Sequence, residues 1–307
     1  MIPGELQAEL KNIWGDRVLF NEPMERHTSM GVGGSADAVI YPRMLGELRK
    51  AVDFLQSRGV PYLPLGNGTN LIVKDGGYRG VFISLERMNG FRFRNEERSA
   101  GMLTAEAGFD LADLVRNAAE AALAGVEFLA GIPGTLGGAI RMNAGAYGHD
   151  ISEIVRTVYL VNGKADLVTL GREDLRFRYR GLELPPGSVI AGADLELRRD
   201  STKDIRRRMK DILEQRKKKH PQGIRSAGSI FKNAPGMPAG RIIEESGLKG
   251  MRIGDAQVSE MHGNFIVNLG SARAADIIAV MEAVRKKVLE SKGVLLEPEV
   301  EVVGDAE

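Results

Sequence analysis

The sequence predicts an α+β protein built from two domains. Its 307 residues exceed what one domain of about 100–200 residues usually holds, so two domains, or three small ones, are expected. Stretches with helical spacing of apolar residues alternate with short apolar stretches typical of strands. The composition changes near residue 200, where a strongly charged helix begins, and we place the domain boundary there.

The first part of the chain predicts a βαβ-like unit. Residues 1–20 favour a short helix, and the apolar segment 36–42 favours a strand that ends at a proline. Residues 45–55 have helical spacing and stop before Gly59. Residues 60–65 form a short apolar stretch that runs directly into a glycine-rich turn.

The middle of the chain predicts a second unit of helix and strands. Residues 111–124 place apolar side chains on one helical face. Residues 158–161 and 167–170 flank Asn162-Gly163, the sequence signal of a hairpin. A strand over 189–197 closes this region.

The last hundred residues again mix helices and strands. The expected elements are a charged helix over 201–220, a helix over 239–246, a strand over 264–268, a helix over 272–290 and a final strand over 294–303. Ile205, Met209 and Ile212 give the charged helix an apolar stripe. Its basic residues predict a solvated face, with a basic pocket for a diphosphate as the alternative.

Composition excludes several classes of function. The chain has 43% hydrophobic and 27% charged residues and a net charge of +1, which disfavours general nucleic-acid binding. The absence of cysteine excludes disulfides, thiolate metal sites and a cysteine nucleophile. The four histidines are scattered, so no metal site is expected. Neither a signal peptide nor a membrane span is indicated, and we expect a cytoplasmic protein.

Glycine is enriched, with 38 residues, about 12% of the chain against an average near 7%. The glycines cluster at 31–34, 66–68, 76–80 and 131–148. A single cluster is best explained by a tight turn, because glycine adopts positive φ without strain. Several clusters in one half of the chain favour a bound cofactor that contains phosphate.

Two short motifs are misleading. Residues 31–36 fit the dinucleotide pattern G-x-G-x-x-G/A, but no buried strand precedes them and no helix follows, so a Rossmann domain is rejected. Residues 229–232 fit the S-x-x-K pattern of β-lactamases. The accompanying S-D-N and K-T-G elements do not occur in the sequence, which excludes that reading as well.

Two glycine-rich segments carry the stronger signal. In the segment 64–73 a strand leads into Gly-Asn-Gly-Thr-Asn, where successive N–H groups can form an anion nest suited to a dinucleotide diphosphate. The segment 131–148 consists almost entirely of small residues, so a large flat ligand can lie directly on its backbone.

Together these motifs resemble the UDP-N-acetylenolpyruvoylglucosamine reductase family, which belongs to the vanillyl-alcohol-oxidase-type flavoproteins. The second half agrees, with Ala-Gly-Ser-Ile-Phe-Lys-Asn at 227–233 and Leu-Glu-Pro-Glu-Val at 296–300. The resemblance extends from about residue 21 to residue 304. The chain has no inserted tyrosine-bearing loop after residue 180, so it resembles the shorter subclass of this family.

The resemblance implies a vanillyl-alcohol-oxidase-type FAD-binding domain and a smaller α/β substrate-binding domain. Residues 1–200 would hold FAD non-covalently in two subdomains, about 1–90 and 91–200. Residues 201–307 would bind the UDP-sugar, with the C-terminal strand returning to the active site. NADPH would reduce the flavin, and the enolpyruvyl ether would then be reduced to UDP-N-acetylmuramate for peptidoglycan synthesis. No obligate protein partner is implied.

The resemblance also assigns residues. Arg180 and Glu299 match the family pair that polarises the substrate carboxylate, and Ser229 matches the proton donor to C2. Arg178 and Glu297 are the neighbouring alternatives. The resemblance implies that Lys232, Asn233 and His262 bind the substrate. For His262, a role in packing is an equal alternative. The implied FAD contacts are Gly66, Asn67, Gly68, Thr69, Asn70, Leu71, Gly134, Thr135, Gly137, Gly138, Asn143, Gly145 and Ala146.

Two other functions stay open at this point. One is another FAD oxidoreductase with a different acceptor, and the motifs around Ser229 and Glu299 argue against it. The other is a flavin- or nucleotide-sugar-binding regulator, which loss of the catalytic residues would favour, although all three residue types are present. Covalent attachment of the flavin has only His149 as a weak candidate.

Overall fold

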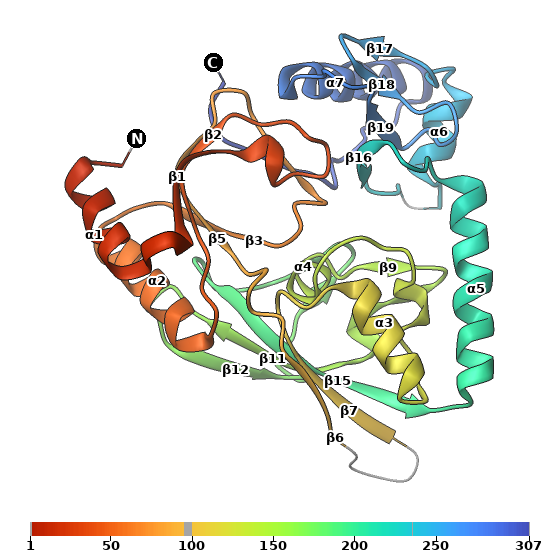
Figure 1. Ribbon diagram of the computed structural model, residues 1–307. Coiled ribbons are helices and arrows are strands. Elements are labelled where there is room, and N and C mark those ends of the chain that lie inside the picture. The colour runs from red at the N-terminus through yellow and green to blue at the C-terminus, as the bar shows by residue number, and fades with distance from the viewer. Residues whose placement is uncertain (1, 95–99, 235, 307) are drawn as a thin grey trace. The chain divides into compact units, whose positions relative to one another are not determined.

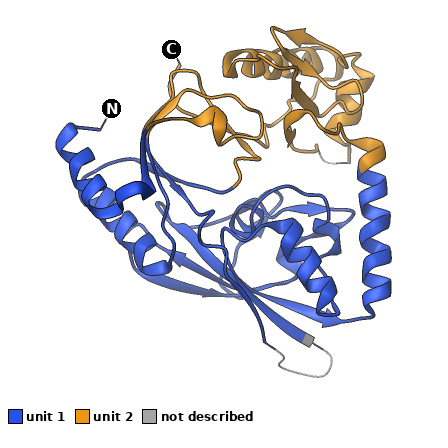
Figure 2. Cartoon of the chain, in the orientation of Figure 1, with its two compact units in different colours: residues 1–20, 38–66, 80–216 blue, residues 21–37, 67–79, 217–307 orange. Residues whose placement is uncertain are grey.

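A computed structural model describes residues 2–94, 100–234 and 236–306 (Figure 1). The chain forms two compact units (Figure 2). Unit 1 comprises residues 1–20, 38–66 and 80–216, and unit 2 comprises residues 21–37, 67–79 and 217–307. These limits differ from a single division near residue 200, because two N-terminal segments belong to the same unit as the C-terminal residues.

Two helices and a four-stranded sheet form the beginning of the fold. The helices are α1 (Gly4–Trp14) and α2 (Leu45–Ser57), and the strands in sheet order are β1 (Val18–Pro23), β2 (Ser35–Ile40), β5 (Tyr78–Ser84) and β3 (Tyr62–Leu65). β3 and β5 are parallel, with Tyr62 opposite Val81. Leu48, Val52 and Leu55 of α2 are fully buried, as their helical spacing predicts. The elements expected over 36–65 are therefore present.

A larger antiparallel sheet lies entirely in unit 1. Its strands in order are β12 (Leu167–Gly171), β11 (Val155–Val161), β15 (Val189–Arg199), β7 (Ala100–Glu106) and β6 (Phe91–Arg94), and β8 (Leu123–Ala124) also pairs with β15. The hairpin expected around Asn162-Gly163 is present, with a longer loop. The Asn162 N–H donates to the Asp166 carbonyl at 3.0 Å, and Ala165, not Gly163, has the positive φ, +62°.

Short helices pack against this sheet. They are α3 (Leu111–Glu120), the 3₁₀ turn η3 (Glu127–Leu129) and α4 (Leu136–Arg141). The Asp110 carboxylate caps α3 by accepting the Ala112 N–H at 2.8 Å. α3 ends before the expected residue 124, because Ala122 has φ +57° and the next residues pair with β15. One continuous hydrophobic core runs through unit 1 from Ile2 to Leu197.

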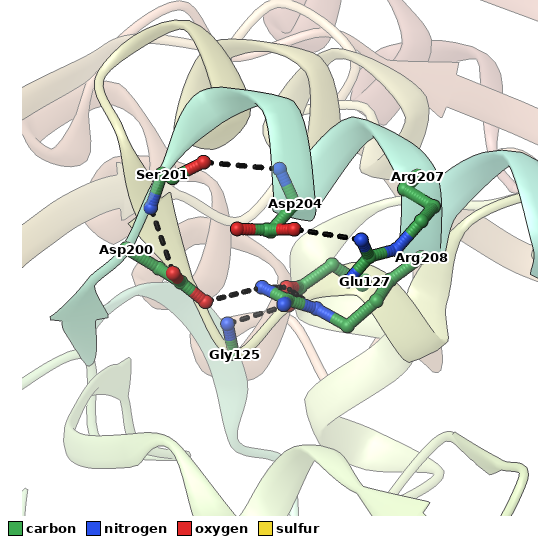
Figure 3. Close-up of polar contacts among 7 residues, drawn as sticks. All are labelled: Gly125, Glu127, Asp200, Ser201, Asp204, Arg207 and Arg208. Carbon is green, nitrogen blue, oxygen red and sulfur yellow. Dashed lines mark hydrogen bonds and ion pairs between the residues drawn. The ribbon is translucent and has the colours of Figure 1, made fainter.

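The charged helix is α5 (Thr202–Lys219), and its apolar stripe is confirmed. Ile205 is fully buried, while Met209 and Ile212 are half-buried against the core of unit 1. Arg206, Arg207 and the final lysines are exposed, in line with a solvated face. Arg208 instead faces the rest of unit 1, where its guanidinium binds the carboxylates of Glu127 and Asp200 (Figure 3).

Unit 2 contains a four-stranded antiparallel sheet, two helices and a separate pair of parallel strands. In order, the sheet strands are β16 (Arg225–Ser229), β19 (Phe265–Asn268), β18 (Ala256–Val258) and β17 (Arg252–Ile253). The helices are α6 (Ala239–Glu245) and α7 (Ala274–Lys292), and the parallel pair is β4 (Leu71–Val73) with β20 (Glu301–Val303). The strand expected over 294–303 is thus confirmed only over its last three residues.

The core of unit 2 explains why N-terminal segments belong to it. Met30, Val32 and Ile72 are buried in one cluster with Phe231 and Val284. Polar contacts add to this packing, since the Asp75 carboxylate accepts the N–H groups of the first two residues of α7 at 3.0 and 2.9 Å. A carboxylate at a helix N-terminus is stabilising because it satisfies N–H groups that lack a partner within the helix.

Candidate active site

The loop 66–71 connects β3 to β4 and adopts a conformation that requires glycine. Gly68 has φ +60°, and a Cβ atom there would lie 1.9 Å from the His27 carbonyl oxygen. The Ser29 N–H donates to the Gly68 carbonyl at 3.1 Å. The loop backbone therefore lies directly on the segment 27–29, which fixes the positions of Asn67, Thr69 and Asn70 around it.

The second glycine-rich segment approaches the same loop within unit 1. A Cβ atom on Gly66 would lie 2.6 Å from the Thr135 hydroxyl, and one on Gly137 would lie 2.8 Å from the Cβ of Ala107. Thr135 is buried and caps α4 by accepting the Gly138 N–H. The strict need for small residues at these positions is thus a matter of close backbone packing.

The surface beyond Thr135 is open. Gly138 is exposed, and a Cβ placed on it would lie 3.5 Å from the Thr135 hydroxyl, an ordinary van der Waals contact. Gly145 and Ala146 are half-exposed. Gly138 and Ala146 therefore present backbone and a small side chain to the outside, as a flat ring needs for close approach, whereas a Cβ atom on Gly145 would lie 2.6 Å from the His149 carbonyl oxygen.

Arg180 is held against this small-residue segment. Its guanidinium donates to the Gly145 carbonyl at 3.0 Å and to the Asn143 carbonyl at 3.5 Å. The buried Asn143 side chain in turn donates to the Arg178 carbonyl at 3.1 Å and accepts the Ser152 N–H at 3.2 Å. The Asn143 amide therefore joins the backbone two residues before Arg180 to the backbone at Ser152.

The local backbone distinguishes Arg180 from its neighbour. Arg180 occupies the turn between β13 (Phe177–Arg178) and β14 (Gly181–Leu182) and has φ +55°. Arg180 is thus a turn residue, whereas Arg178 is the last residue of β13. Arg178 is exposed and pairs with Glu183 at 3.5 Å.

Ser229 ends strand β16 in unit 2, opposite Phe265 of β19. The pairing shifts register just before it, where Gly228 has φ +70°. The following backbone is fixed by the buried Asn264, whose side chain accepts the Phe231 N–H at 2.9 Å and donates to the Phe231 carbonyl at 2.8 Å. Asn264 is a site residue that sequence reasoning missed, because its role depends on a partner 33 residues away.

Glu299 lies beside the segment that carries Ser229. Its N–H donates to the Ile230 carbonyl at 2.7 Å, and Ile230 directly follows Ser229. Phe231 forms an isolated bridge with Pro298. The structure therefore brings two of the three expected catalytic residues onto adjoining backbone segments of unit 2, while Arg180 belongs to unit 1.

Glu297 has a different environment. Its carboxylate pairs with the Lys232 ammonium at 3.6 Å, and its side chain is 72% exposed. The Lys232 N–H also donates to the Glu297 carbonyl at 2.8 Å. Glu297 and Glu299 precede β20, so the confirmed part of the strand expected over 294–303 includes neither carboxylate. Their main-chain partners differ, and Glu299 is the one joined to Ile230, next to Ser229.

The expected substrate-binding residues are distributed around α6. Asn233 is exposed, and its side-chain oxygen accepts the Ala239 N–H at the start of the helix at 2.9 Å. Lys232 is half-buried, with the Glu297 contact described above. Both residues follow Ser229 closely in the chain and belong to the same unit.

His262 packs in an aromatic cluster. Its ring centre lies 4.9 Å from that of Phe265 and 5.4 Å from that of His220. The ring nitrogen Nδ1 accepts the Asn264 N–H at 3.1 Å, which places the ring proton of the neutral form on Nε2. Burial, and secondarily the charge of Lys249, lowers the pKa of His262 below its ordinary value.

The described parts of the chain, residues 2–94, 100–234 and 236–306, offer neither a metal centre nor a membrane-spanning helix. Within these ranges no group of three or more His, Cys, Asp or Glu side chains is arranged to hold a metal ion. Within the same ranges no helix has the length and apolar character that crossing a bilayer requires.

Comparison with known proteins identifies the family. A UDP-N-acetylenolpyruvoylglucosamine reductase from Syntrophus aciditrophicus is 46% identical over 300 residues, covering 98% of this chain and 96% of the relative. The chain belongs to this family. A second reductase of this name, from Geotalea uraniireducens, is 44% identical over 285 residues, which is 93% of each chain.

Family models and a solved structure agree. Residues 219–303 match the C-terminal domain of UDP-N-acetylenolpyruvoylglucosamine reductase, and residues 36–171 match an FAD binding domain. The crystal structure of UDP-N-acetylenolpyruvylglucosamine reductase from Thermus caldophilus superimposes with a TM-score of 0.79 at 36% identity, covering 93% of this chain and 97% of that one. The protein is an α+β, FAD-binding oxidoreductase.

The residues present fit an FAD molecule. Within unit 1, Gly138 and Ala146 leave room for close approach by a flat ring. Within unit 2, Gly68 forms a turn in which the backbone has a left-handed conformation. Such a turn orients successive N–H groups toward one side, the arrangement that binds a diphosphate. FAD would supply hydride transfer at this site.

Proposed function

We propose that the protein catalyses the NADPH-dependent, FAD-mediated reduction of UDP-N-acetyl-3-O-(1-carboxyvinyl)-glucosamine to UDP-N-acetylmuramate. The printed names of the relatives specify an enolpyruvyl sugar as their substrate. The observation that carries the proposal is the junction of the Ser229 and Glu299 segments through the 2.7 Å hydrogen bond between Glu299 N–H and Ile230 C=O. It places an alcohol donor and a carboxylate on adjoining segments of one unit.

The chemistry explains which groups the site needs. FAD, when bound, would supply hydride transfer from NADPH to C3 of the enolpyruvyl group. Negative charge then spreads from C2 into the substrate carboxylate, and a proton must reach C2 to complete the reduction. The hydride that originates from NADPH brings two electrons and one hydrogen nucleus, and the protein adds one proton, so the product gains the elements of H₂.

Arg180 is the residue proposed to stabilise the developing charge, acting with Glu299 on the substrate carboxylate. A well-placed donor to such charge lowers the barrier by about 3 kcal/mol. The guanidinium is anchored by the Asn143 and Gly145 carbonyls, so its orientation is set before the substrate binds. Preorganisation of this kind avoids the free-energy cost of reorienting the charge during the reaction.

Ser229 is the proposed proton donor to C2. A serine hydroxyl is a weak acid in water, but a strongly basic enolate in a site shielded from water can accept its proton. Backbone bonds of Ile230 and Phe231 to Asn264 hold the residues that follow Ser229. Lys232, three positions further along, adds a nearby positive charge that favours the deprotonated serine.

The residues proposed to bind the diphosphate, the sugar and FAD are those that the sequence predicts. Lys232, Asn233 and His262 would contact the diphosphate or sugar, and the loop 66–71 with residues 134–146 would hold FAD non-covalently. The product is a precursor of peptidoglycan, which is consistent with action in the cytoplasm on a nucleotide-linked sugar.

One spectroscopic experiment tests the proposal. The FAD-loaded protein is reduced anaerobically with NADPH, which bleaches the visible flavin band, and the UDP-enolpyruvyl sugar is then added. Rapid return of the oxidised-flavin band is the expected result. A flavin that is reduced by NADPH but stays bleached after the sugar is added contradicts the substrate assignment while preserving the FAD assignment.

A further inference from the structure

Asn70 ends the glycine-rich loop and contacts the segment of Glu299. Its side-chain amide donates to the Glu299 carbonyl at 3.1 Å. Its own carbonyl accepts the Glu301 N–H at 3.0 Å. The sequence places Asn70 among the FAD contacts, whereas these two hydrogen bonds join it to the C-terminal strand on both sides of residue 300.

Glu299 is thereby held through both of its main-chain polar groups. Its N–H donates to Ile230, next to Ser229, and its carbonyl accepts from Asn70. The parallel pairing of β4 and β20 begins only at Leu71 opposite Glu301, after this point. Glu299 lies outside that ladder, so its position depends on contacts from these other segments.

A second link joins the same loop to the strand of Ser229. The Ser29 N–H donates to the Gly68 carbonyl at 3.1 Å, and the Ser29 hydroxyl donates to the Ser226 carbonyl of β16 at 2.8 Å. The loop is therefore connected at Gly68 to the strand that ends in Ser229, and at Asn70 to Glu299. All of these residues belong to unit 2.

We propose that Asn70 is a positioning residue that sets the Glu299 backbone relative to Ser229. The inference rests on the function proposed above and adds a role for the loop beyond cofactor binding. The Asn70 amide is required as a donor, because a carboxylate in its place would present an acceptor to the Glu299 carbonyl. Two acceptors at about 3 Å repel each other and displace the strand.

The test separates the two half-reactions. Asn70→Asp replaces the donor by an acceptor at constant size, and Asn70→Ala removes it without adding charge. Because Asn70 also lies in the loop proposed to hold FAD, both variants are assayed fully loaded with FAD, and the expected readout is a larger loss in the rate of reoxidation by the sugar than in the rate of reduction by NADPH. Reoxidation by the UDP-enolpyruvyl sugar is expected to slow by about 10- to 100-fold, since a displacement near 1 Å in a reacting group has effects of this size.

Asn67→Asp is the matched control, because it makes the same chemical change in the same loop at an exposed side chain. It is expected to weaken FAD retention and leave the ratio of reoxidation to reduction rates near that of the wild type. The double variant Asn70→Asp with Glu299→Gln is expected to reoxidise within about twofold of Glu299→Gln alone, since residues that act through one another are not additive.

Several outcomes overturn the proposal. Loss of FAD together with a slower reductive step in Asn70→Ala would make Asn70 a cofactor contact. Normal reoxidation in both Asn70 variants, or fully additive losses in the double variant, would exclude positioning of Glu299. Failure of the wild-type protein to reoxidise with the sugar would instead reject the proposed function. Thermal melting of each FAD-loaded variant identifies a general loss of folding.

Discussion

Replacement of Arg208 by alanine tests how strongly the ion pairs of Arg208 hold α5 against the rest of unit 1. Arg208 donates to the Glu127 carboxylate at 2.7 and 2.9 Å and to Asp200 at 2.7 Å (Figure 3). The Glu127 side chain is 8% exposed and that of Arg208 is 33% exposed. Without the guanidinium, the Glu127 carboxylate keeps the Gly125 N–H, at 2.6 Å, as its remaining partner in Figure 3.

The expected loss of stability follows from the burial of Glu127. Breaking a fully buried ion pair costs about 3–5 kcal/mol, because a charge is left out of water without its partner. Arg208 is one-third exposed, so water can reach the carboxylate after truncation and the cost is lower. We expect Arg208→Ala to reduce the free energy of unfolding by about 2 kcal/mol.

Urea unfolding followed by the fluorescence of Trp14 provides the measurement. Trp14 is the only tryptophan and is buried in the core of unit 1, so its signal reports the unit that contains Glu127. Arg207→Ala is the control on the same helix. Its pair with Asp204 spans 2.9 Å between side chains that are 64% and 39% exposed, and its loss is expected to cost less than about 0.5 kcal/mol.

Equal effects of the two substitutions would refute the reasoning, because burial of Glu127 would then make no difference. A change below about 0.5 kcal/mol for Arg208→Ala would do so as well, since it would place the pair in the class of exposed salt bridges.

Three further predictions concern unit 2. Ser229→Ala is expected to leave flavin reduction by NADPH nearly normal and to slow reoxidation by the sugar by about 10²- to 10⁴-fold; equal losses in both half-reactions would make Ser229 structural. Gly68→Ala is expected to cost more than the about 1–2 kcal/mol of left-handed strain alone, because of the His27 carbonyl, and to weaken FAD retention. Gly247→Ala is the control, because Gly247 has φ +67° and a Cβ added there would meet no atom of the described residues within 4 Å beyond its chain neighbours. Thermal melting of the two variants then separates the cost of left-handed strain from the cost of the clash with His27. Because burial lowers the pKa of His262, the unfolded chain binds its proton more readily, so stability is expected to fall as pH drops below about 6.5. His262→Gln should flatten that part of the stability–pH curve, and an unchanged curve would exclude the histidine as its source.

The sequence predicted elements well where one local pattern decides them. Apolar spacing located α2, α5 and α7 because helical periodicity is a property of neighbouring residues. It failed at 294–300, where alternating apolar and acidic residues suggested a strand. Pro298 has no N–H to donate to a ladder, and this stretch is held instead by single bonds such as the one from Glu299 to Ile230.

The site was predictable in its residue types and less so in its connections. The motifs selected Ser229 and Glu299, and the structure places their segments side by side. The turn conformation of Arg180 and the contact from Asn70 to Glu299 were not predictable, since no periodic signal encodes a contact across 229 positions. For the same reason the sequence did not show that 21–37 and 67–79 pack with C-terminal residues.

The pairing of β4 with β20 has a consequence for the order of folding during synthesis. Leu71 leaves the ribosome long before its partner Glu301, and Met30 and Ile72 wait equally long for the rest of their core. Every segment of unit 1 has been made once residue 216 has been added, whereas unit 2 stays incomplete until the final strand emerges. During that interval Met30, Val32 and Ile72 lack the C-terminal residues that bury them in the native fold, and apolar surface exposed in this way promotes aggregation of a nascent chain.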